Sequence, residues 1–436
     1  MKLARKGYYD RMLEDVRLPR MIGVRLAYDP HCVMDVEAET RAQLEGCGCL
    51  ERVSGKTVAL GVGSRGIRNL PLLVRTTVGV LRAHGADVFI VPAMGSHGGA
   101  DAEGQASLLR HLGVTPEAVG AEIRSDMEPV VIGETGDGVP VYFDANAAGA
   151  DYTVTIARIK PHTTFRGSYE SGMVKMNVIG LGKQRGADFC HIRGMANMPD
   201  NLLKIGRVSL ERSNLLLSLA VVENAYDQTY LIRAVPKERI LEEETGLLET
   251  AGRLMPRIPF GELDMLVVDE IGKNITGTGM DPNIIQRFSS EHMPADPFIK
   301  RLVILRMTDA TDGNAAGAGF ADIASMQVYE KMEMEKTYPN SLTARTTIPS
   351  KMPIFMENDL MALKAGIKTA PDVDYERMRI VRIRNTLCMD RMELSEALAA
   401  EARELPNVEL ATEPYSLPFD RETGNLPASG FLYEAF

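Results

Sequence analysis

The sequence predicts an α/β protein with two domains whose sheets are mainly parallel. The chain has 436 residues, which is too long for one ordinary hydrophobic core. Short buried-strand patterns alternate with helical patterns along most of its length, as is typical of parallel sheets. The stretch "PRIPFGEL" interrupts this alternation near residue 258. We therefore expect an N-terminal domain over 1–258 and a C-terminal domain over 259–412, followed by a tail over 413–436 that packs back on the N-terminal domain.

The N-terminal domain begins its sheet with a strand, a helix, a second strand and a second helix. Thr57–Val62 is short, apolar and β-branched, which predicts a buried strand. Apolar residues recur with helical spacing over Leu70–Ala83, and Asp87–Pro92 has the pattern of the second strand. The next helix covers 101–112, with Asp101 as its N-cap. This order predicts a parallel sheet with right-handed crossovers.

Further strands follow in both domains. Tyr152–Ile159 is a third strand, and the buried strand Leu215–Ala225 precedes a helix-rich stretch over Lys237–Leu254. In the C-terminal domain, the strand Leu263–Asp269 is followed by a loop of Gly, Thr and Asn. The stretch "RLVILRMTDATDGNAAGAGFADIA" repeats this design as strand, polar loop and helix, and Met378–Ile383 is a later strand.

Composition and charge argue against several classes of protein. The net charge of −10 disfavours nucleic acid as a partner, because phosphate binding needs a basic surface. No long stretch lacks charge and the N-terminus has no apolar core behind its basic residues, so we expect neither a membrane span nor a secretion signal. Five scattered cysteines favour a reducing, cytoplasmic compartment. Cys47 and Cys49 lack a partner pair at zinc-finger spacing, which argues against zinc there.

Polar and basic residues follow three predicted strands of the N-terminal domain. Ser64 and Arg65 follow the first strand, His97 lies in "GSHGG" after the second, and His162 follows the third. Ligands of open α/β sheets bind beyond the carboxyl ends of the strands, so we expect these side chains at one edge of one sheet. Each of these residues also has an ordinary explanation when it is considered alone. A histidine in a loop is more often a surface residue, and Arg65 could be a surface ion-pair partner. The "GSHGG" loop could cradle a phosphate or simply form a tight turn.

The next segment is rich in Gly, Met and Val and contains a lysine and a histidine. Lys175 lies in "SGMVKMNVIGLG", whose small and apolar residues predict that it is buried. Lysine is rarely buried without a partner, and a desolvated lysine tends to lose its proton and become a nucleophile for covalent attachment. Cys190 and His191 together are a weak metal signal, and Cys190 has the character of a small packing residue.

These residues, taken together and in order, resemble a known family. The set comprises Arg65, His97 in "GSHGG", His162 in "PH", Lys175 in "SGMVK", "IGLG" at Ile179–Gly182, and His191 in "CH". From about residue 55 to about residue 195, their order and approximate spacing are similar to those of the nickel-dependent lactate racemase family. The remainder of the chain agrees with that family in length and two-domain layout.

The resemblance implies a cofactor and a role for each residue. The cofactor is a nickel-pincer nucleotide, a pyridinium-3-thioamide-5-thiocarboxylic acid mononucleotide, attached covalently to Lys175 and loaded by separate biosynthetic enzymes. By position, His191 binds the nickel, while His97 and His162 act as acid and base on the substrate hydroxyl. Arg65, beside Ser64, would hold an anionic group of the cofactor or substrate. The family fold implies two α/β domains with the active site in the cleft between them.

Two departures from the family pattern bear on the cofactor and on the substrate. An acidic residue is expected shortly before the arginine, but Val62 and Gly63 stand there, so the residues that hold the cofactor phosphate are not identified. The chain has no tryptophan, which the family's lactate-specific members use in the second domain. Polar loops take its place, and Lys273 and Asn274 in them could bind a carboxylate or several hydroxyls. The alternative, that Lys273 is an ordinary solvated loop lysine, is equally expected. These features favour a hydroxy acid larger than lactate, such as a sugar acid.

The sequence therefore predicts an isomerase, a racemase or epimerase of 2-hydroxy acids that removes and returns a hydride. Two histidines suit this reaction because imidazole titrates near neutrality and each can serve one enantiomer. One alternative is a metal-dependent hydrolase or lyase that uses His97, His162 and His191 as ligands. Another is a non-catalytic protein that binds a nucleotide or cofactor through "GSHGG" and Arg65.

Overall fold

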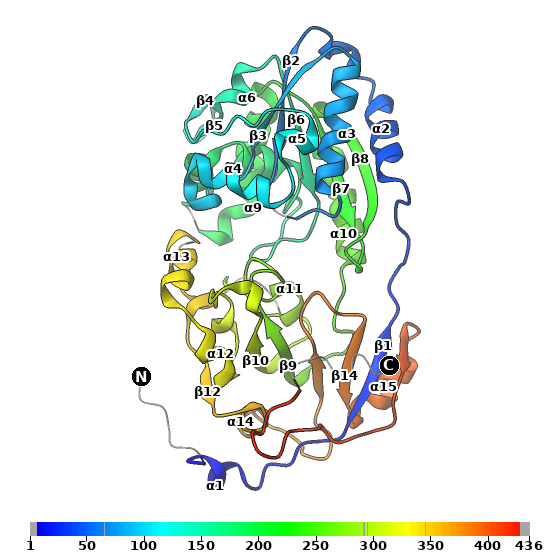
Figure 1. Ribbon diagram of the computed structural model, residues 1–436, viewed down its shortest axis with the longest axis vertical. Helices are drawn as coiled ribbons and strands as arrows, with labels where there is room; N and C mark the ends of the chain where they lie inside the picture. Colours follow the sequence, from blue (N-terminus) through cyan, green and yellow to red (C-terminus); the bar gives the residue numbers. More distant parts are fainter. Residues whose placement is uncertain are drawn as a thin grey trace. The chain divides into compact units, whose positions relative to one another are not determined.

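The computed structural model describes residues 7–64, 66–192, 194–290, 293, 295–344 and 346–427. The chain forms two compact units. Residues 29–255 form one, the central unit, and residues 7–28 join 256–427 in the other, the terminal unit (Figure 1). Both units contain helices and mainly parallel sheets, which confirms the predicted α/β class. In the part of the chain described, no helix is long and apolar enough to cross a membrane.

A five-stranded sheet forms the centre of the central unit. In sheet order its strands are β3 (Asp87–Pro92), β2 (Thr57–Val62), β6 (Tyr152–Arg158), β7 (Leu215–Glu223) and β8 (Thr229–Pro236). The first four are parallel, and β8 returns antiparallel beside β7. The predicted bounds of β2 and β3 are confirmed, because short apolar runs between glycines and turns mark buried strands well.

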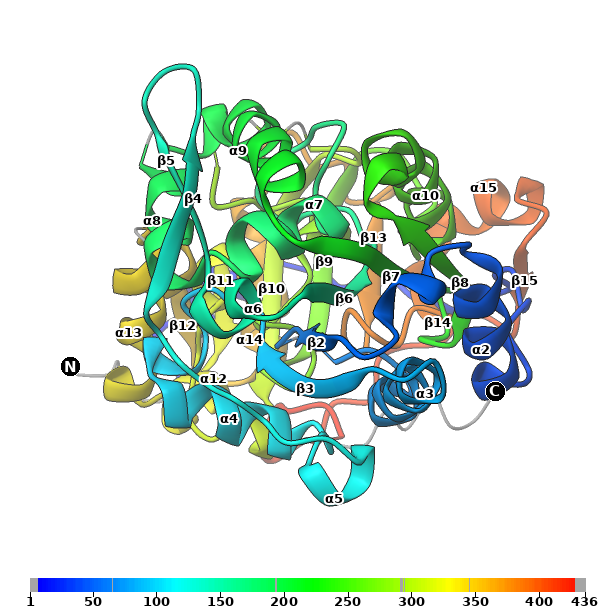
Figure 2. The same cartoon turned by 90° about the horizontal axis from the view of Figure 1, so that it is seen from above.

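Helices cover both faces of this sheet. They are α2 (Val36–Gly46), α3 (Leu70–Ala83), α4 (Ala102–His111), α5 (Pro116–Val119), α6 (Ala145–Gly149), α7 (Met173–Lys175), α8 (Lys183–His191), α9 (Met198–Arg212) and α10 (Ile240–Leu254). Figure 2 shows α9 and α10 on one side of the sheet and α3 on the other. One apolar cluster joins α3 to the sheet, and a second joins α9 and α10 to it. A separate hairpin of β4 (Pro129–Glu134) and β5 (Pro140–Asp144) packs against α8 and α9.

The terminal unit is built on an eight-stranded mixed sheet. In sheet order its strands are β12 (Ile354–Met356), β11 (Ile323–Ser325), β10 (Ile299–Met307), β9 (Leu263–Ile271), β13 (Ile380–Ile383), β14 (Arg391–Ser395), β1 (Met21–Leu26) and β15 (Val408–Leu410). The first five are parallel, and the last three pair antiparallel. Its helices are α1 (Asp10–Leu13), α11 (Pro282–Ile285), α12 (Met326–Lys331), α13 (Met334–Ala344), α14 (Asp359–Thr369) and α15 (Ala399–Glu404).

The place of β1 corrects the expected division of the chain. We expected residues 1–258 to form one domain, but β1 lies between β14 and β15 of the terminal unit. Met21 faces Ser395 and Leu26 faces Val408, more than 370 residues further along the chain. Pairing over such a separation leaves no local pattern in the sequence, so periodicity alone does not reveal it.

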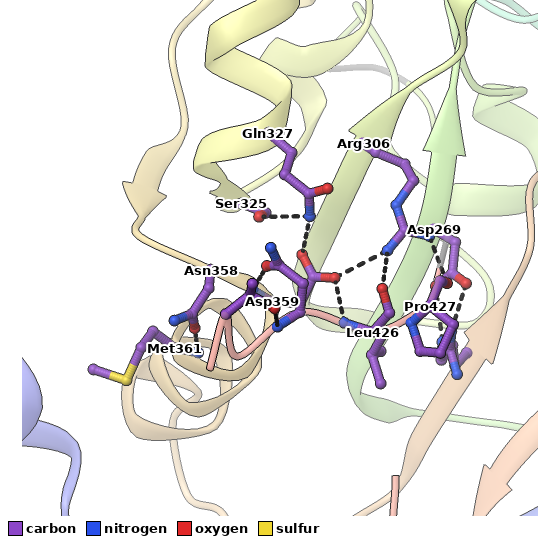
Figure 3. A network of polar contacts seen from close by, with 12 residues as sticks. Asp269, Arg306, Ser325, Gln327, Asn358, Asp359, Met361, Leu426 and Pro427 are labelled. Carbon is purple, nitrogen blue, oxygen red and sulfur yellow. Dashed lines mark hydrogen bonds and ion pairs between the residues drawn. The ribbon is translucent and has the colours of Figure 1, made fainter. Parts of the chain in front are cut away.

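The tail also differs from its expected place, because its described part packs on the terminal unit. Tyr415 pairs with Met21, and Tyr415, Leu417, Phe419 and Leu426 contact the apolar cluster that α14 shares with the sheet. A polar network then fixes residues 424–427 at the start of α14 (Figure 3). Residues 428–436 of the predicted tail lie outside the described part of the chain.

Asp359 is the centre of that network. Its carboxylate is fully buried and forms an ion pair with Arg306 Nη2 at 2.9 Å. Gln327 Nε2 donates to it at 2.9 Å, and the backbone N–H of Leu426 donates at 3.0 Å (Figure 3). Arg306 in turn donates to the carbonyl of Pro427 at 3.1 Å. A buried charge is tolerated when it is paired and hydrogen-bonded in this way, so the network holds the tail in place.

Candidate functional site

The ends of β2 and β3 bring Ser64 and His97 together. These strands are parallel neighbours in which Val62 faces Pro92, so the residues that follow them leave the sheet at the same edge. The Ser64 hydroxyl and His97 Nδ1 form a short hydrogen bond. Arg65, the third residue expected here, lies outside the described residues.

The "GSHGG" loop is held by α4. The fully buried side chain of Gln105 donates to the carbonyl oxygens of Gly95, at 2.9 Å, and His97, at 3.1 Å. Gly98 has a φ of 66°, and a Cβ on it would lie 2.8 Å from the backbone nitrogen of Gln105. The glycine is therefore needed for the turn and for the close approach of α4. The loop presents His97 as an exposed side chain.

His162 lies in a loop that starts at the end of β6 and returns just before α7. Lys160 and Ser171 close the loop through two backbone hydrogen bonds of 2.9 and 3.2 Å. Inside it, the buried carboxylate of Glu170 accepts from the backbone N–H of His162 at 2.6 Å and of Gly167 at 3.1 Å. Burial raises the pKa of Glu170, and the two N–H groups oppose this rise.

The hydrogen bonds of His162 select one tautomer of its ring. The ring stacks on Phe165 at 4.2 Å, and the backbone N–H of Thr164 donates to Nδ1 at 3.2 Å. Because a backbone N–H can only donate, Nδ1 is the unprotonated nitrogen and a neutral ring carries its hydrogen on Nε2. His97 differs, because the Ser64 hydroxyl can donate to its Nδ1 or accept from it. The neutral His162 is thus a donor at Nε2, whereas His97 can adopt either tautomer.

Lys175 and His191 lie in one nearly continuous helical segment. It runs from α7 through a π-helical turn, η3 (Met176–Gly180), into α8, which ends at His191. π-helical turns are rare and often occur at functional sites. This segment follows the His162 loop directly.

The loops after β2 and β3 pack tightly against the π-helical turn. A Cβ on Gly63 would lie 2.9 Å from Met176 Cε, and one on Gly180 would lie 2.8 Å from the carbonyl oxygen of Ala93. The backbone N–H of Gly95 donates to the carbonyl of Gly180 at 3.1 Å. Small residues on both sides allow this contact. The segment that carries Lys175 therefore lies directly beside the loops that carry Ser64 and His97.

Among the lysines that the structure describes, Lys183 and not Lys175 is completely buried. Lys175 is only partly buried, which corrects the expectation drawn from its apolar neighbours. Lys183 has no exposed surface, and its Nζ lies 2.7 Å from the Asp144 carboxylate and 2.7 Å from the carbonyl of Pro92. Its charge is compensated by Asp144, which is also fully buried. Lys183 therefore fixes the start of α8 against the end of β3.

A buried glutamate, Glu244 of α10, holds the start of the Lys175 segment. Its carboxylate has no exposed surface and accepts from the backbone N–H of Val174 at 2.8 Å. Gly172 has no side chain because a Cβ there would clash with Glu244 Oε1. Within the described residues, Oε1 has no hydrogen-bond partner. Burial raises the pKa of Glu244 to about 7, and the N–H of Val174 opposes the rise.

The sequence analysis did not identify Glu244 or Glu170 as site residues. Glu244 does have a signal, because it occupies the apolar stripe of α10 between Ile240 and Leu247. An acidic residue at a core position of a helix is unusual and indicates a buried carboxyl with a specific partner.

His191 is oriented by its own helix. Its Nδ1 lies 2.5 Å from the carbonyl oxygen of Ala187, which can only accept, so Nδ1 carries a hydrogen. In the neutral ring, the lone pair is then on Nε2. Histidines that bind metals usually donate their other ring N–H to a carbonyl or carboxylate in this way.

Cys190 and Met195 connect the remaining parts of the site. Burial raises the pKa of the Cys190 thiol to about 12, and the charge of Lys175 opposes the rise. Cys190 Sγ also contacts Met198 Sδ at 3.6 Å, which agrees with the predicted packing role. Thr164 Oγ1, in the His162 loop, lies 3.8 Å from Met195 Sδ, four residues after His191. The His162 loop thus leads into the Lys175 segment and also contacts the chain that follows it.

The donor set fits a metal held by one protein ligand. Among the described residues, no three His, Cys, Asp or Glu side chains form a group that could bind a metal ion. His97, His162 and His191 therefore do not form the three-histidine metal site that the hydrolase or lyase alternative requires. His191 alone, with its Nε2 lone pair, matches a cofactor whose other metal donors are its own. Lys175, partly buried in the same helical segment, matches a tether.

Lys273 and Asn274, the predicted substrate residues, lie in a loop of the terminal unit after β9. Lys273 Nζ donates to the carbonyl of Gly277 at 2.6 Å, and its backbone N–H donates to Thr311 Oγ1 at 3.0 Å. Asn274 accepts from Thr308 Oγ1 at 2.6 Å. These hydrogen bonds stabilise the loop itself, which agrees with the alternative that Lys273 is an ordinary loop residue. A role in substrate binding stays a prediction, as does a site in the cleft between domains.

No protein-family model and no curated protein matches the sequence. Similar solved structures include the lactate racemase apoprotein from Thermoanaerobacterium thermosaccharolyticum, with 14% identity and a TM-score of 0.42 over 65% of this chain and 73% of that chain. Another is the crystal structure of a Thermotoga maritima protein, with 13% identity and a TM-score of 0.42 over 62% of this chain and 69% of that chain. Likenesses at this level do not establish function, which must be argued from the residues of the site.

Proposed function

We propose that the protein is an isomerase that racemises or epimerises a 2-hydroxy acid. In this proposal, Lys175 tethers a nickel-pincer nucleotide and His191 binds its nickel. When bound, such a cofactor supplies an acceptor and donor of hydride, which no amino-acid side chain provides. The chain itself has to position the substrate, exclude water and move the hydroxyl proton.

One observation carries this proposal: the segment that holds Lys175 and His191 packs against the loops that hold Ser64 and His97. Gly63, Gly95 and Gly180 make the contact possible. The Nδ1 hydrogen bond of His191 to Ala187 places the lone pair of the neutral ring on Nε2, the nitrogen that a metal would bind in this proposal. The motif resemblance to nickel-dependent lactate racemases supports the same assignment.

The two histidines would share the proton transfer unequally. The neutral His162 carries its hydrogen on Nε2, so it is suited to donate a hydrogen bond or a proton to a substrate oxygen. His97 can switch tautomer with the Ser64 hydroxyl and is suited to accept the substrate's hydroxyl proton. When the other enantiomer reacts, the proton has to pass in the opposite direction, which is why two groups are needed. The polar loops of the terminal unit favour a substrate larger than lactate, such as a sugar acid.

The proposal is tested by intact-mass spectrometry and metal analysis of protein expressed together with the cofactor-making enzymes. We expect about one nickel per chain and a mass increase that peptide mapping assigns to Lys175. Lys175→Ala should lose both the mass increase and all isomerase activity. Lys204→Ala, which changes an exposed lysine of the same unit, is the matched control and should keep both.

The histidine variants separate loading from chemistry. His97→Ala and His162→Ala should each retain the cofactor and lose inversion of the substrate. Failure of either variant to load would mean that its proton-transfer role is misassigned. Full activity in Lys175→Ala would overturn the tether. Nucleotide binding without turnover and without a mass change on Lys175 would favour the non-catalytic alternative.

A further inference from the structure

Cys47 and Cys49 form a pair of thiols where α2 ends. Cys47 caps the helix in a helical conformation, and its N–H donates to the carbonyl of Leu44 at 3.2 Å. Gly48 follows with a φ of 72°, the left-handed conformation in which glycine commonly ends helices. This turn reverses the chain, so that Cys49 folds back beside Cys47. The two sulfur atoms lie 2.9 Å apart.

The two thiols have different environments. Cys49 is 7% exposed and belongs to the apolar cluster between α3 and the sheet, whereas Cys47 is only partly buried at the edge of that cluster. Nothing lies within 4 Å of a Cβ placed on Gly48, so the turn between them is open on its outer side. A molecule from solution can therefore reach Cys47 before Cys49.

We propose that Cys47 and Cys49 are a redox-active dithiol that exchanges with the disulfide of an oxidised low-molecular-weight thiol. Cys47 is the attacking sulfur and Cys49 the resolving sulfur. The proposal does not depend on the isomerase assignment. The pair lies before the N-terminal end of β2, whereas Ser64 follows the carboxyl end of the same strand.

The exchange balances in two steps. The Cys47 thiolate attacks one sulfur of the small disulfide, forming a mixed disulfide and releasing one small thiolate. Cys49, on losing its proton to water, then attacks Cys47 Sγ and releases the second small thiolate. The protein loses two electrons and two protons, and the small disulfide is reduced to two thiols. The sulfur atoms need to approach by only about 1 Å for this bond to form.

The hydrogen bonds around the pair favour this division of roles. The contact with the Cys49 thiol, together with backbone N–H groups, lowers the pKa of Cys47 to about 7 against the effect of burial. The same contact with Cys47, together with burial, raises the pKa of Cys49. A partly exposed thiol with a lowered pKa is the usual nucleophile of such pairs. A disulfide between Cys47 and Cys49 would close a ring over only one intervening residue and would be strained. Strained disulfides are readily reduced again.

Oxidised glutathione is the probe for the test, with reduced protein near neutral pH. Trypsin releases both cysteines in the single peptide Ala42–Arg52, which holds no other cysteine. In the wild type, we expect this peptide to lose the mass of two hydrogens and to regain it on reduction. Cys49→Ser should instead accumulate one glutathione on Cys47, because the resolving thiol is absent. Cys47→Ser should form adducts much more slowly.

A second readout compares the thiols directly. At about pH 7, Cys47 should react with iodoacetamide about threefold faster than Cys32, since its larger thiolate fraction outweighs the lower reactivity of a less basic sulfur. Cys32→Ser is the matched control and should leave the oxidation of the Ala42–Arg52 peptide unchanged. Circular dichroism checks that each variant folds, and Cys47→Ala replaces Cys47→Ser if the latter does not.

Two results would overturn the proposal. The first is a wild-type peptide that carries separate glutathione adducts on both cysteines and no internal disulfide. The second is equal alkylation of Cys47 and Cys32, with equal adduct formation in Cys47→Ser and Cys49→Ser. Loss of isomerase activity on oxidation is not part of the expectation, so these outcomes are independent of whether the proposed function holds.

Discussion

Asp359 and Glu244 are both fully buried carboxyl groups near the start of a helix, but they differ in what surrounds them. Asp359 has an arginine counter-ion, a side-chain amide donor and a backbone N–H donor. Glu244 has no counter-ion: the backbone N–H of Val174 donates to it at 2.8 Å, the N–H of Met173 also favours its ionised form, and Oε1 has no hydrogen-bond partner within the described residues. The first group is compensated as an anion, and the second is not.

This difference indicates two purposes for a buried charge. The network of Asp359 closes the terminal unit by holding the tail. Burial raises the pKa of this carboxyl group too, but the N–H of Leu426 and the charge of Arg306 oppose the rise. Glu244 lies beside the residue that precedes Lys175, and burial raises its pKa to about 7. A carboxyl group in that position can gain or lose its proton near neutral pH, at the base of the segment that we propose carries the cofactor.

The largest expected effect is that of Asp359→Ala. The substitution leaves Arg306 buried without its counter-ion and removes the acceptor for Leu426, so the free energy of unfolding should fall by about 3–5 kcal/mol. Urea unfolding of the full-length protein measures the loss. Asp309→Ala removes a surface ion pair with Lys331 and is the control, which should change stability little. Equal losses in the two variants would contradict the compensating role of Arg306.

The next effect is the pH dependence that Glu244 gives to stability. An unfolded glutamate ionises near pH 4.5 and the folded one near pH 7, so the folded protein binds more protons between these values. Stability should therefore fall as the pH rises through this window, by about 3 kcal/mol from this group. Glu244→Gln does not titrate and removes that contribution. Wild type and variant are compared by urea unfolding at about pH 4.5 and about pH 8.

Parallel pH profiles for the wild type and Glu244→Gln would contradict this account. They would mean that the carboxyl group is ionised equally easily in the folded and unfolded chains. Asp359 and Glu244 would then differ in contacts alone.

The smallest effect is that of Gly172→Ala. A Cβ at this position clashes with Glu244 Oε1, so the variant should lose about 1–3 kcal/mol of stability as the carboxyl group is displaced. In a Glu244→Ala background the added methyl has room, and most of the loss should disappear. Gly246→Ala, on the exposed side of the same α10 helix, should instead stabilise by about 0.5–1 kcal/mol. A stabilising Gly172→Ala would show that the contact with Glu244 is loose.

Local patterns in the sequence predicted the parts of the fold that depend on neighbours in the chain. The strand Thr57–Val62 and the helix Leu70–Ala83 have the predicted bounds, because each combines a periodic apolar run with a clear end. The meeting of Ser64 and His97 followed from a topological rule, since parallel strands deliver their carboxyl ends to one edge.

Those local patterns did not predict contacts between distant segments of the chain. Lys183 stands beside Gln184 and Arg185 and has the local character of a surface residue, yet Asp144 draws it into the interior. Lys175 has apolar neighbours and is nevertheless partly exposed, because it lies at the edge of the packed segment. Lys183 is buried because it pairs with Asp144, which lies about 40 residues earlier in the chain, and the periodicity of the sequence does not reveal such a partner.

The position of β1 has a consequence for how the chain acquires its structure during synthesis. Residues 29–255 emerge from the ribosome as one uninterrupted stretch and contain every strand of their own sheet. Strand β1 must wait, because its neighbours β14 and β15 are translated much later. The central unit is thus able to fold while translation continues, whereas the sheet of the terminal unit can be completed only after residues 391–410 have been made.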